Sequence, residues 1–165
     1  MTAPLISGRA RRSVAALGAV SAGLLVLSAC DKPTPLATVT VGTSSVSTEA
    51  PSGCKAEKGK DLALERVQEC LTDPKGAKDI EYGHGDTLRL GVEPEVVEDG
   101  KRWQVVLDGQ PVVDPTSNTY RSFPNVDIFA TGNQGGSPAS RRLGIVQLAE
   151  DGKPLAVWSY QLNLK

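Results

Sequence analysis

Apolar and polar side chains alternate along most of the second half of this chain, and this alternation limits the folds that the chain can adopt. From Thr87 onward, apolar residues recur at every second position in two clear runs: Leu88, Leu90 and Val92, then Trp103, Val105 and Leu107. The dipeptide Asp-Gly recurs at 99–100, 108–109 and 151–152, and it supplies the positive φ that tight hairpin turns require. Period two with such turns predicts a protein built of antiparallel strands.

Other segments complete this prediction. Residues 36–41 (LATVTV) alternate apolar and hydroxyl side chains and predict a half-buried strand, whereas 43–53, rich in Ser, Thr, Pro and Ala, predict a loop. Further strands are expected at 120–123, 126–130, 143–148 and 155–164. One helix is expected over 61–71, with Asp61 as its N-cap, because Leu64, Val67 and Leu71 recur at helical spacing.

Short strands, few helices and no alternation of strands with helices favour an antiparallel β-sandwich of immunoglobulin-like type as a single domain over 36–165. A small open barrel is the alternative. Cys54 and Cys70 flank the predicted helix and are expected to form a disulfide that pins it, so the inter-sheet bridge of immunoglobulin domains should be absent. Two free thiols are the alternative, and these cysteines lack the spacing of zinc ligands.

The first 29 residues have the pattern of a cleaved export signal. Arg9, Arg11 and Arg12 precede an apolar run over 14–27. As a helix this run would extend about 21 Å, which is short of the roughly 30 Å needed to cross a bilayer core. Arg11-Arg12 weakly matches a twin-arginine signal, and the general secretory route is favoured.

The run ends in Leu27-Ser28-Ala29-Cys30, which resembles the lipobox of bacterial lipoproteins. That resemblance implies a diacylglyceryl group on the Cys30 sulfur, cleavage just before it, and 30–35 as a short tether. Anchoring by more than one acyl chain is stable, whereas a single chain holds a protein only marginally. An ordinary signal peptide followed by a buried cysteine is the alternative.

Stretches beyond the lipobox are similar to small actinobacterial lipoproteins of uncharacterised function. They are Asp31 to Gly42, Leu88 to Val92, Trp103 to Gly109 and Thr119 to Arg121. The resemblance implies a location on the extracytoplasmic face of the cell membrane, and it implies no activity.

Charge argues against a nucleic-acid partner. Without the three arginines of the signal, 15 basic residues face 19 acidic ones, whereas nucleic-acid binding requires a basic surface. We also expect no cofactor and no metal.

Few side chains suggest a site. The only histidine, His84, lies among glycines and is expected in an exposed turn. The acidic cluster Glu93, Glu95, Glu98 and Asp99 matches no calcium loop and is expected to be solvated.

Two features could form a contact surface. Trp103 and Trp158 fall on apolar strand faces and are expected in the core, with a ligand-stacking platform as the alternative. The glycine-rich segment 131–142, which ends in Arg141 and Arg142, is the best candidate contact loop.

The leading functional hypothesis is a non-enzymatic, membrane-anchored envelope protein whose β-domain binds another envelope component. The alternative is a small-ligand carrier or sensor with a pocket between the sheets or under 131–142. A hydrolase that uses His84 is a third possibility, and no nucleophile motif accompanies that histidine.

Overall fold

The computed structural model describes residues 34–73, 75–124 and 139–165, and Thr34–Lys165 forms one compact unit. Within these residues no helix has the length and apolar character needed to cross a membrane. The predicted signal, Cys30 and the strand expected at 126–130 lie outside the described residues.

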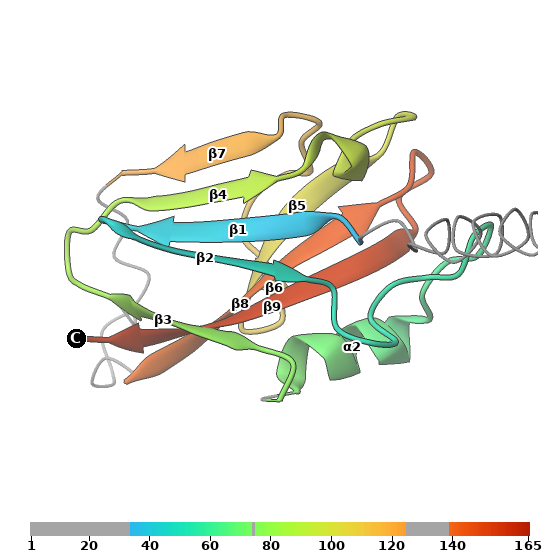
Figure 1. Cartoon of the computed structure of the whole chain (residues 1–165). Coiled ribbons are helices and arrows are strands. Elements are labelled where there is room, and N and C mark those ends of the chain that lie inside the picture. The colour runs from blue at the N-terminus through green and yellow to red at the C-terminus, as the bar shows by residue number, and fades with distance from the viewer. Residues whose placement is uncertain (1–33, 74, 125–138) are drawn as a thin grey trace, which may run out of the picture. The chain divides into compact units, whose positions relative to one another are not determined.

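The first sheet has the strand order β2-β1-β4-β7, with every pairing antiparallel (Figure 1). Its strands are β1 (Leu36–Val41), β2 (Ser44–Glu49), β4 (Leu88–Val92) and β7 (Tyr120–Phe123). The strand expected at 36–41 is therefore confirmed. The loop expected over 43–53 is wrong, because Ser44–Glu49 pairs with β1 along its whole length.

The second sheet has the order β3-β9-β8-β5-β6. Its strands are β3 (Lys78–Tyr82), β5 (Arg102–Leu107), β6 (Gln110–Pro111), β8 (Ser140–Leu148) and β9 (Pro154–Leu164), and the short 3-10 helix η2 (Pro94–Val96) precedes β5. Strand β3 pairs with β9 in parallel, so this sheet is mixed and not purely antiparallel as predicted. Its short run KDIEY has only two buried side chains, Ile80 and Tyr82, and gave no clear periodic signal.

The strand order is that of an immunoglobulin-like sandwich. With β4 taken as strand B, β7 and β1 hold the places of E and A, while β6, β5, β8 and β9 follow the order C′, C, F and G. The predicted fold class is confirmed, and the two separate sheets exclude the open barrel. Trp103 lies on β5, where immunoglobulin domains keep a buried tryptophan.

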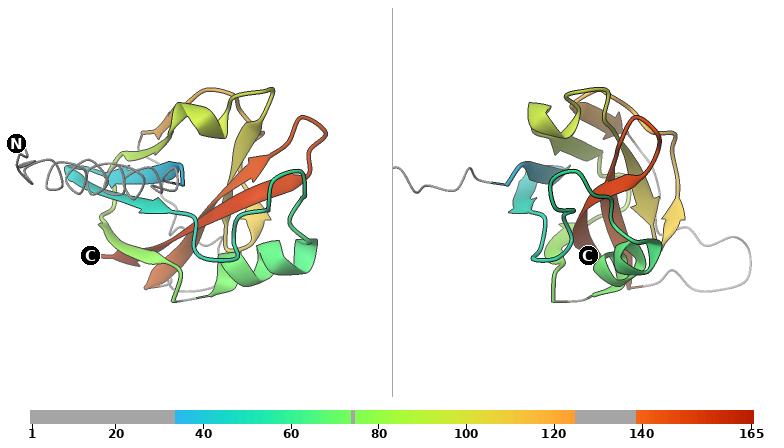
Figure 2. Two further views of the ribbon diagram at one scale, coloured as in Figure 1. Left: turned by 45° about the vertical axis from the view of Figure 1, so that its right-hand side comes forward. Right: turned by 90° about the vertical axis from the view of Figure 1, so that its right-hand side faces the viewer.

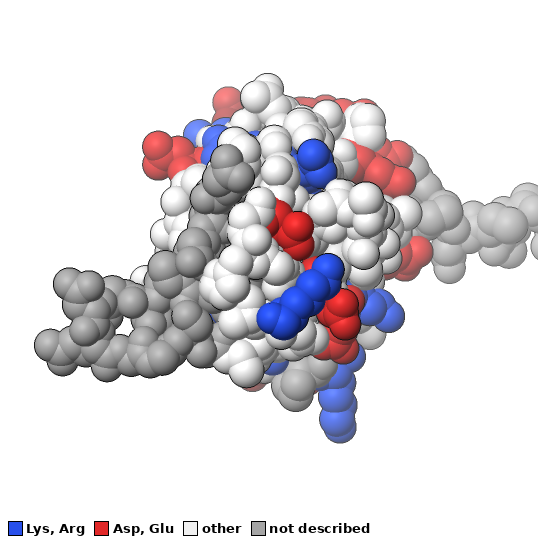
Figure 3. Space-filling view, turned by 90° about the vertical axis from the view of Figure 1, so that its left-hand side faces the viewer, with Lys and Arg blue, Asp and Glu red and all other residues white. Residues whose placement is uncertain are grey.

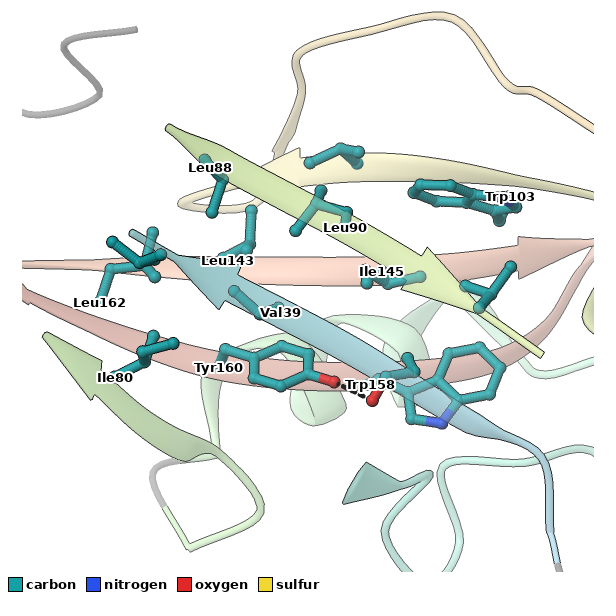
Figure 4. Packing of buried hydrophobic residues seen from close by; sticks show 14 of the residues in the cluster. Val39, Ile80, Leu88, Leu90, Trp103, Leu143, Ile145, Trp158, Tyr160 and Leu162 are labelled. Atoms are coloured by element: carbon teal, nitrogen blue, oxygen red, sulfur yellow. Dashed lines mark hydrogen bonds between the residues drawn. The ribbon is translucent and has the colours of Figure 1, made fainter. Parts of the chain in front are cut away.

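The main core fills the space between the two sheets. Its largest fully buried side chains include Tyr82 as well as Trp103, Trp158 and Tyr160. Figure 4 shows the last three. Their polar atoms all find backbone acceptors, which removes the cost of burying them. For example, the Tyr160 hydroxyl donates to the Ala37 carbonyl at 2.6 Å and so joins β9 to β1 across the sandwich. The tryptophans therefore serve as core residues.

A second, smaller core lies on the outer side of the second sheet. Helix α2 (Leu64–Thr72) packs there against β8 and β9 (Figure 2). The helix begins three residues later than predicted, and Asp61 is not its N-cap: Ala63 holds that position without a side-chain cap. Because α2 covers this face, every residue from Leu143 to Leu148 is buried, on both sides of the sheet.

Gly144 on β8 allows α2 to approach closely. A Cβ atom at this position would lie 2.2 Å from the Leu71 Cδ2 atom. We expect Gly144→Ala to lower the free energy of unfolding by about 1–3 kcal/mol, as overpacking does, measured by denaturant titration. In a Leu71→Ala background the same substitution should cost nearly nothing, and an equal cost in both backgrounds would contradict this account.

Candidate functional site

The chain enters the domain at a point that is held from three sides. The Thr34 hydroxyl donates to Glu49 Oε2 at 2.5 Å, and the Leu36 amide donates to Glu93 Oε2 at 2.9 Å. From the opposite sheet, Trp158 Nε1 donates to the Pro35 carbonyl at 3.2 Å. The first described residues, Thr34 to Leu36, are therefore fixed to both sheets by hydrogen bonds.

Two carboxylates of the acidic cluster, which was predicted to be solvated, have different partners. Glu93 fixes the start of β1, and Asp99 forms an exposed ion pair with Lys101 at 3.2 Å. Among the described residues, no three His, Cys, Asp or Glu side chains come together in a way that could hold a metal ion.

Cys54 and Cys70 form the predicted disulfide, with Cα atoms 5.8 Å apart. Cys70 lies in α2 and its carbonyl accepts a bond from the buried Ser159 hydroxyl at 2.6 Å, so the bridge joins the helix, the preceding loop and β9. A pocket of about 340 Å³ opens beside it. Its lining comprises Pro51, Ser52, Cys54, Arg66, Glu69, Cys70, Thr72, Asp73 and Gly76.

The Arg66 side chain lines that pocket, and most of its hydrogen-bonding groups are already bonded to neighbouring residues. Its Nε donates to the Gly53 carbonyl at 2.8 Å and its Nη1 pairs with Glu69 at 2.8 Å. A Cβ atom at Gly53 would lie 2.4 Å from Arg66 Nη2, and Gly53 also has a positive φ of 76°. These contacts close the loop onto the helix.

Arg141 and Arg142 bind neighbouring parts of the domain itself. The Arg141 Nε pairs with the Asp108 carboxylate, which also accepts the Arg142 amide at 2.8 Å. Arg142 Nη1 donates to the Asp73 carbonyl, just beyond α2, at 2.9 Å. The Arg141 side chain is only 18% exposed. Both arginines thus hold the Asp108-Gly109 turn and the end of α2 against β8, and residues 131–138 of the candidate loop lie outside the described chain.

The end of the domain that carries the C terminus shows no patch of one charge sign. Acidic and basic side chains are interspersed over its visible described surface (Figure 3). His84 lies in an exposed turn, as predicted, within a loop that Asp86 closes by accepting the Gly83 amide at 2.9 Å.

Burial determines the chemistry of the aromatic groups. It raises the pKa of the Tyr160 phenol well above the ordinary value, so this group stays protonated and donates its hydrogen bond to Ala37. Trp103 and Trp158 are both 0% exposed and do not line the pocket beside the disulfide.

The outer face of the first sheet is a surface that the sequence did not indicate as a candidate site. It carries two hydroxyl pairs, Thr38 with Ser47 and Thr40 with Ser45, whose oxygens lie 2.7 and 2.9 Å apart. We call these four residues the hydroxyl ladder. Strand β2 could have been predicted only from alternation along Ser44–Glu49. That alternation is weak because both faces of this edge strand are largely polar.

Comparisons with known proteins show a distant likeness in structure alone. No family model matches the sequence, and no curated protein matches it. The chain is similar to the fibronectin(III)-like modules of Clostridium thermocellum CbhA, at 12% identity and a TM-score of 0.37. That match covers 58% of this chain and 93% of the other.

Proposed function

We propose that this chain is a lipid-anchored protein of the cell envelope, attached through Cys30, whose β-sandwich acts as a non-enzymatic module that binds a neighbouring envelope protein. The observation that supports this most is the short distance along the chain between Cys30 and the held residues Thr34 to Leu36. Four residues span at most about 14 Å, so the lipid would keep the domain next to the membrane surface.

The packing of the core argues against the alternative function, a small-ligand carrier with a pocket between the sheets. A ligand there would need an apolar cavity lined by Trp103 or Trp158, and both side chains are fully packed. Their indole nitrogens already donate to backbone carbonyls, at 2.7 Å for Trp103 and 3.2 Å for Trp158.

Cys30→Ala tests the anchor. We expect this variant to move from the membrane fraction to the soluble fraction of lysed cells and to lose metabolic labelling by a radioactive fatty acid, because the acyl chains supply the attachment. Ser28→Ala, which keeps a small residue before the cysteine, should behave as the wild type. Continued membrane attachment of Cys30→Ala would contradict the proposed anchor.

The interaction is tested by crosslinking on living cells followed by affinity capture of the full chain. A neighbour recovered with the wild type and lost with Cys30→Ala would support a module that the lipid places beside its target. Capture of no specific neighbour by either form would contradict the interaction role.

A further inference from the structure

The outer face of the first sheet carries polar side chains on all four strands and one exposed aromatic residue, Tyr120, on the edge strand β7. Buried side chains of β1 and β4 point into the core, so their alternate residues point outward. Two cross-strand rows result. One row runs Ser47, Thr38, Gly91 and Tyr120, and the other runs Ser45, Thr40, Arg89 and Ser122. Figure 1 shows these strands in order from β7 to β2.

The side chains of the hydroxyl ladder are fixed by their mutual hydrogen bonds, and each pair can still bond to a ligand. In each pair one hydroxyl donates to the other, which leaves one O–H donor and several lone pairs directed to solvent. Cross-strand bonding fixes the rotamers in advance, so a ligand that uses these groups loses less side-chain entropy on binding.

Tyr120 stands beside an empty space on this face. It is 54% exposed and lies directly opposite Gly91. The Val92 amide donates to the Thr119 carbonyl, so the neighbouring Gly91–Tyr120 pair is of the closely spaced, non-hydrogen-bonded kind. Gly91 has no side chain, and a Cβ atom there would meet only the Thr119 carbonyl oxygen at 3.8 Å, which leaves an open gap above Gly91 between the positions of Tyr120 and Thr38.

Charged groups of both signs flank the two rows. Glu49 and Glu93 each use one carboxylate oxygen to hold the start of β1, and Arg89 uses Nη1 to reach the Gly42 carbonyl at 3.3 Å. By the strand register, Glu49 and Arg89 belong to the outer face of the sheet. The charges are of opposite sign, which matches a neutral ligand better than an anionic one.

We propose that this face, which we call the glycan face, binds a neutral polysaccharide chain of the cell envelope. Sugar hydroxyls match the donors and acceptors of the ladder, and the apolar C–H face of a sugar ring can stack on Tyr120. Three strand spacings of about 4.8 Å give a width of roughly 14 Å from β2 to β7, enough for a short run of sugar rings. The residues involved are distinct from Cys30, so this inference goes beyond the proposed anchor, while the choice of a cell-envelope glycan rests on the location proposed above.

Cosedimentation tests the proposal. The full chain in detergent micelles is mixed with insoluble cell-wall polysaccharide that has been purified from the producing bacterium and freed of protein and lipid. We expect the wild type to sediment with the polysaccharide, and Tyr120→Ala to bind about tenfold more weakly, as loss of an aromatic anchor commonly does. Val112→Ala, which removes another exposed apolar side chain, should bind as the wild type.

Gly91→Val provides a variant that should fold normally. A Cβ atom at Gly91 would meet only the Thr119 carbonyl oxygen, at 3.8 Å, and valine favours strands. We expect an unchanged or higher melting temperature together with at least a tenfold loss of polysaccharide binding, because the new side chain fills the gap. Wild-type affinity in Gly91→Val, or no sedimentation of the wild type, would overturn the proposal.

Two further measurements, the salt dependence of binding and the membrane fractionation of Tyr120→Ala, distinguish glycan binding from charge attraction and from the Cys30 anchor. Binding through the glycan face should persist when salt is raised, whereas binding that salt abolishes would mean attraction to charged groups and would overturn it. Tyr120→Ala should leave the membrane fraction unchanged. Failure of the glycan proposal is thereby distinguished from failure of the Cys30 anchor.

Discussion

Trp158→Ala is expected to lower the free energy of unfolding by about 3–5 kcal/mol, the usual cost of deleting a buried aromatic side chain. The ring is 0% exposed in the main core, and its Nε1 donates to the Pro35 carbonyl. The substitution therefore leaves a cavity and also removes the bond that joins β9 to the start of β1. For a domain whose total stability is of the order of 5–15 kcal/mol, this is a large fraction.

Denaturant titration followed by far-UV circular dichroism measures this loss. Trp158→Phe keeps an aromatic ring in the core while it removes the donor to Pro35. About 1–2 kcal/mol of loss is therefore expected, from the unpaired carbonyl together with the smaller ring. Val112→Ala, at a residue 51% exposed, should change stability by no more than about 0.5 kcal/mol. Equal losses for Trp158→Ala and Val112→Ala would contradict the assigned core role.

The double variant Cys54→Ser, Cys70→Ser should be destabilised by about 3 kcal/mol, because the 16-residue separation of its cysteines gives the bridge that effect in the chain-entropy model. The loss should fall unevenly on the molecule. Helix α2 has only nine residues and no N-cap side-chain bond, so it depends on the bridge and on the smaller core for its order.

Amide hydrogen exchange measures this uneven loss. We expect protection to fall most in α2 and in the loop that carries Cys54, while the ladder between β1 and β4 keeps most of its protection relative to global unfolding. Wild-type protein treated with a reductant serves as the matched control, since it has both cysteines and no bridge. Uniform loss of protection, or an unchanged unfolding midpoint, would contradict this division into two cores.

Elements with one buried and one polar face were predictable from the sequence. The period-two runs at Leu88–Val92 and Trp103–Leu107, and the hairpin at 150–154, appear as expected because the pleat alone sets their pattern. The pairing of Cys54 with Cys70 followed because the third cysteine, Cys30, was assigned to the lipid. These features follow from the pattern and spacing of residues along the sequence, which is why they could be predicted.

Features that depend on which segments pair, and not on a segment's own side-chain pattern, were not predictable from the sequence. Strand β2 is largely polar on both faces and is held as a strand by its ladder with β1. Strand β3 is ordered by parallel pairing with β9, some 80 residues away in sequence. Arg141 and Arg142 looked like a contact surface, yet their partners Asp108 and Asp73 come from other elements. Tyr120 opposite Gly91 likewise became visible only with the register of β4 and β7.

The position of β1 in its sheet determines how the domain responds to mechanical load. Any pull on the residues before Thr34 passes into β1, which is bonded to β2 on one side and to β4 on the other. A pull directed along the strand would load both ladders in shear at the same time, so their hydrogen bonds would resist it together. Trp158 and Tyr160 add attachments across the sandwich at Pro35 and Ala37. The strand that links the domain to the preceding residues is thus secured on three sides against extraction.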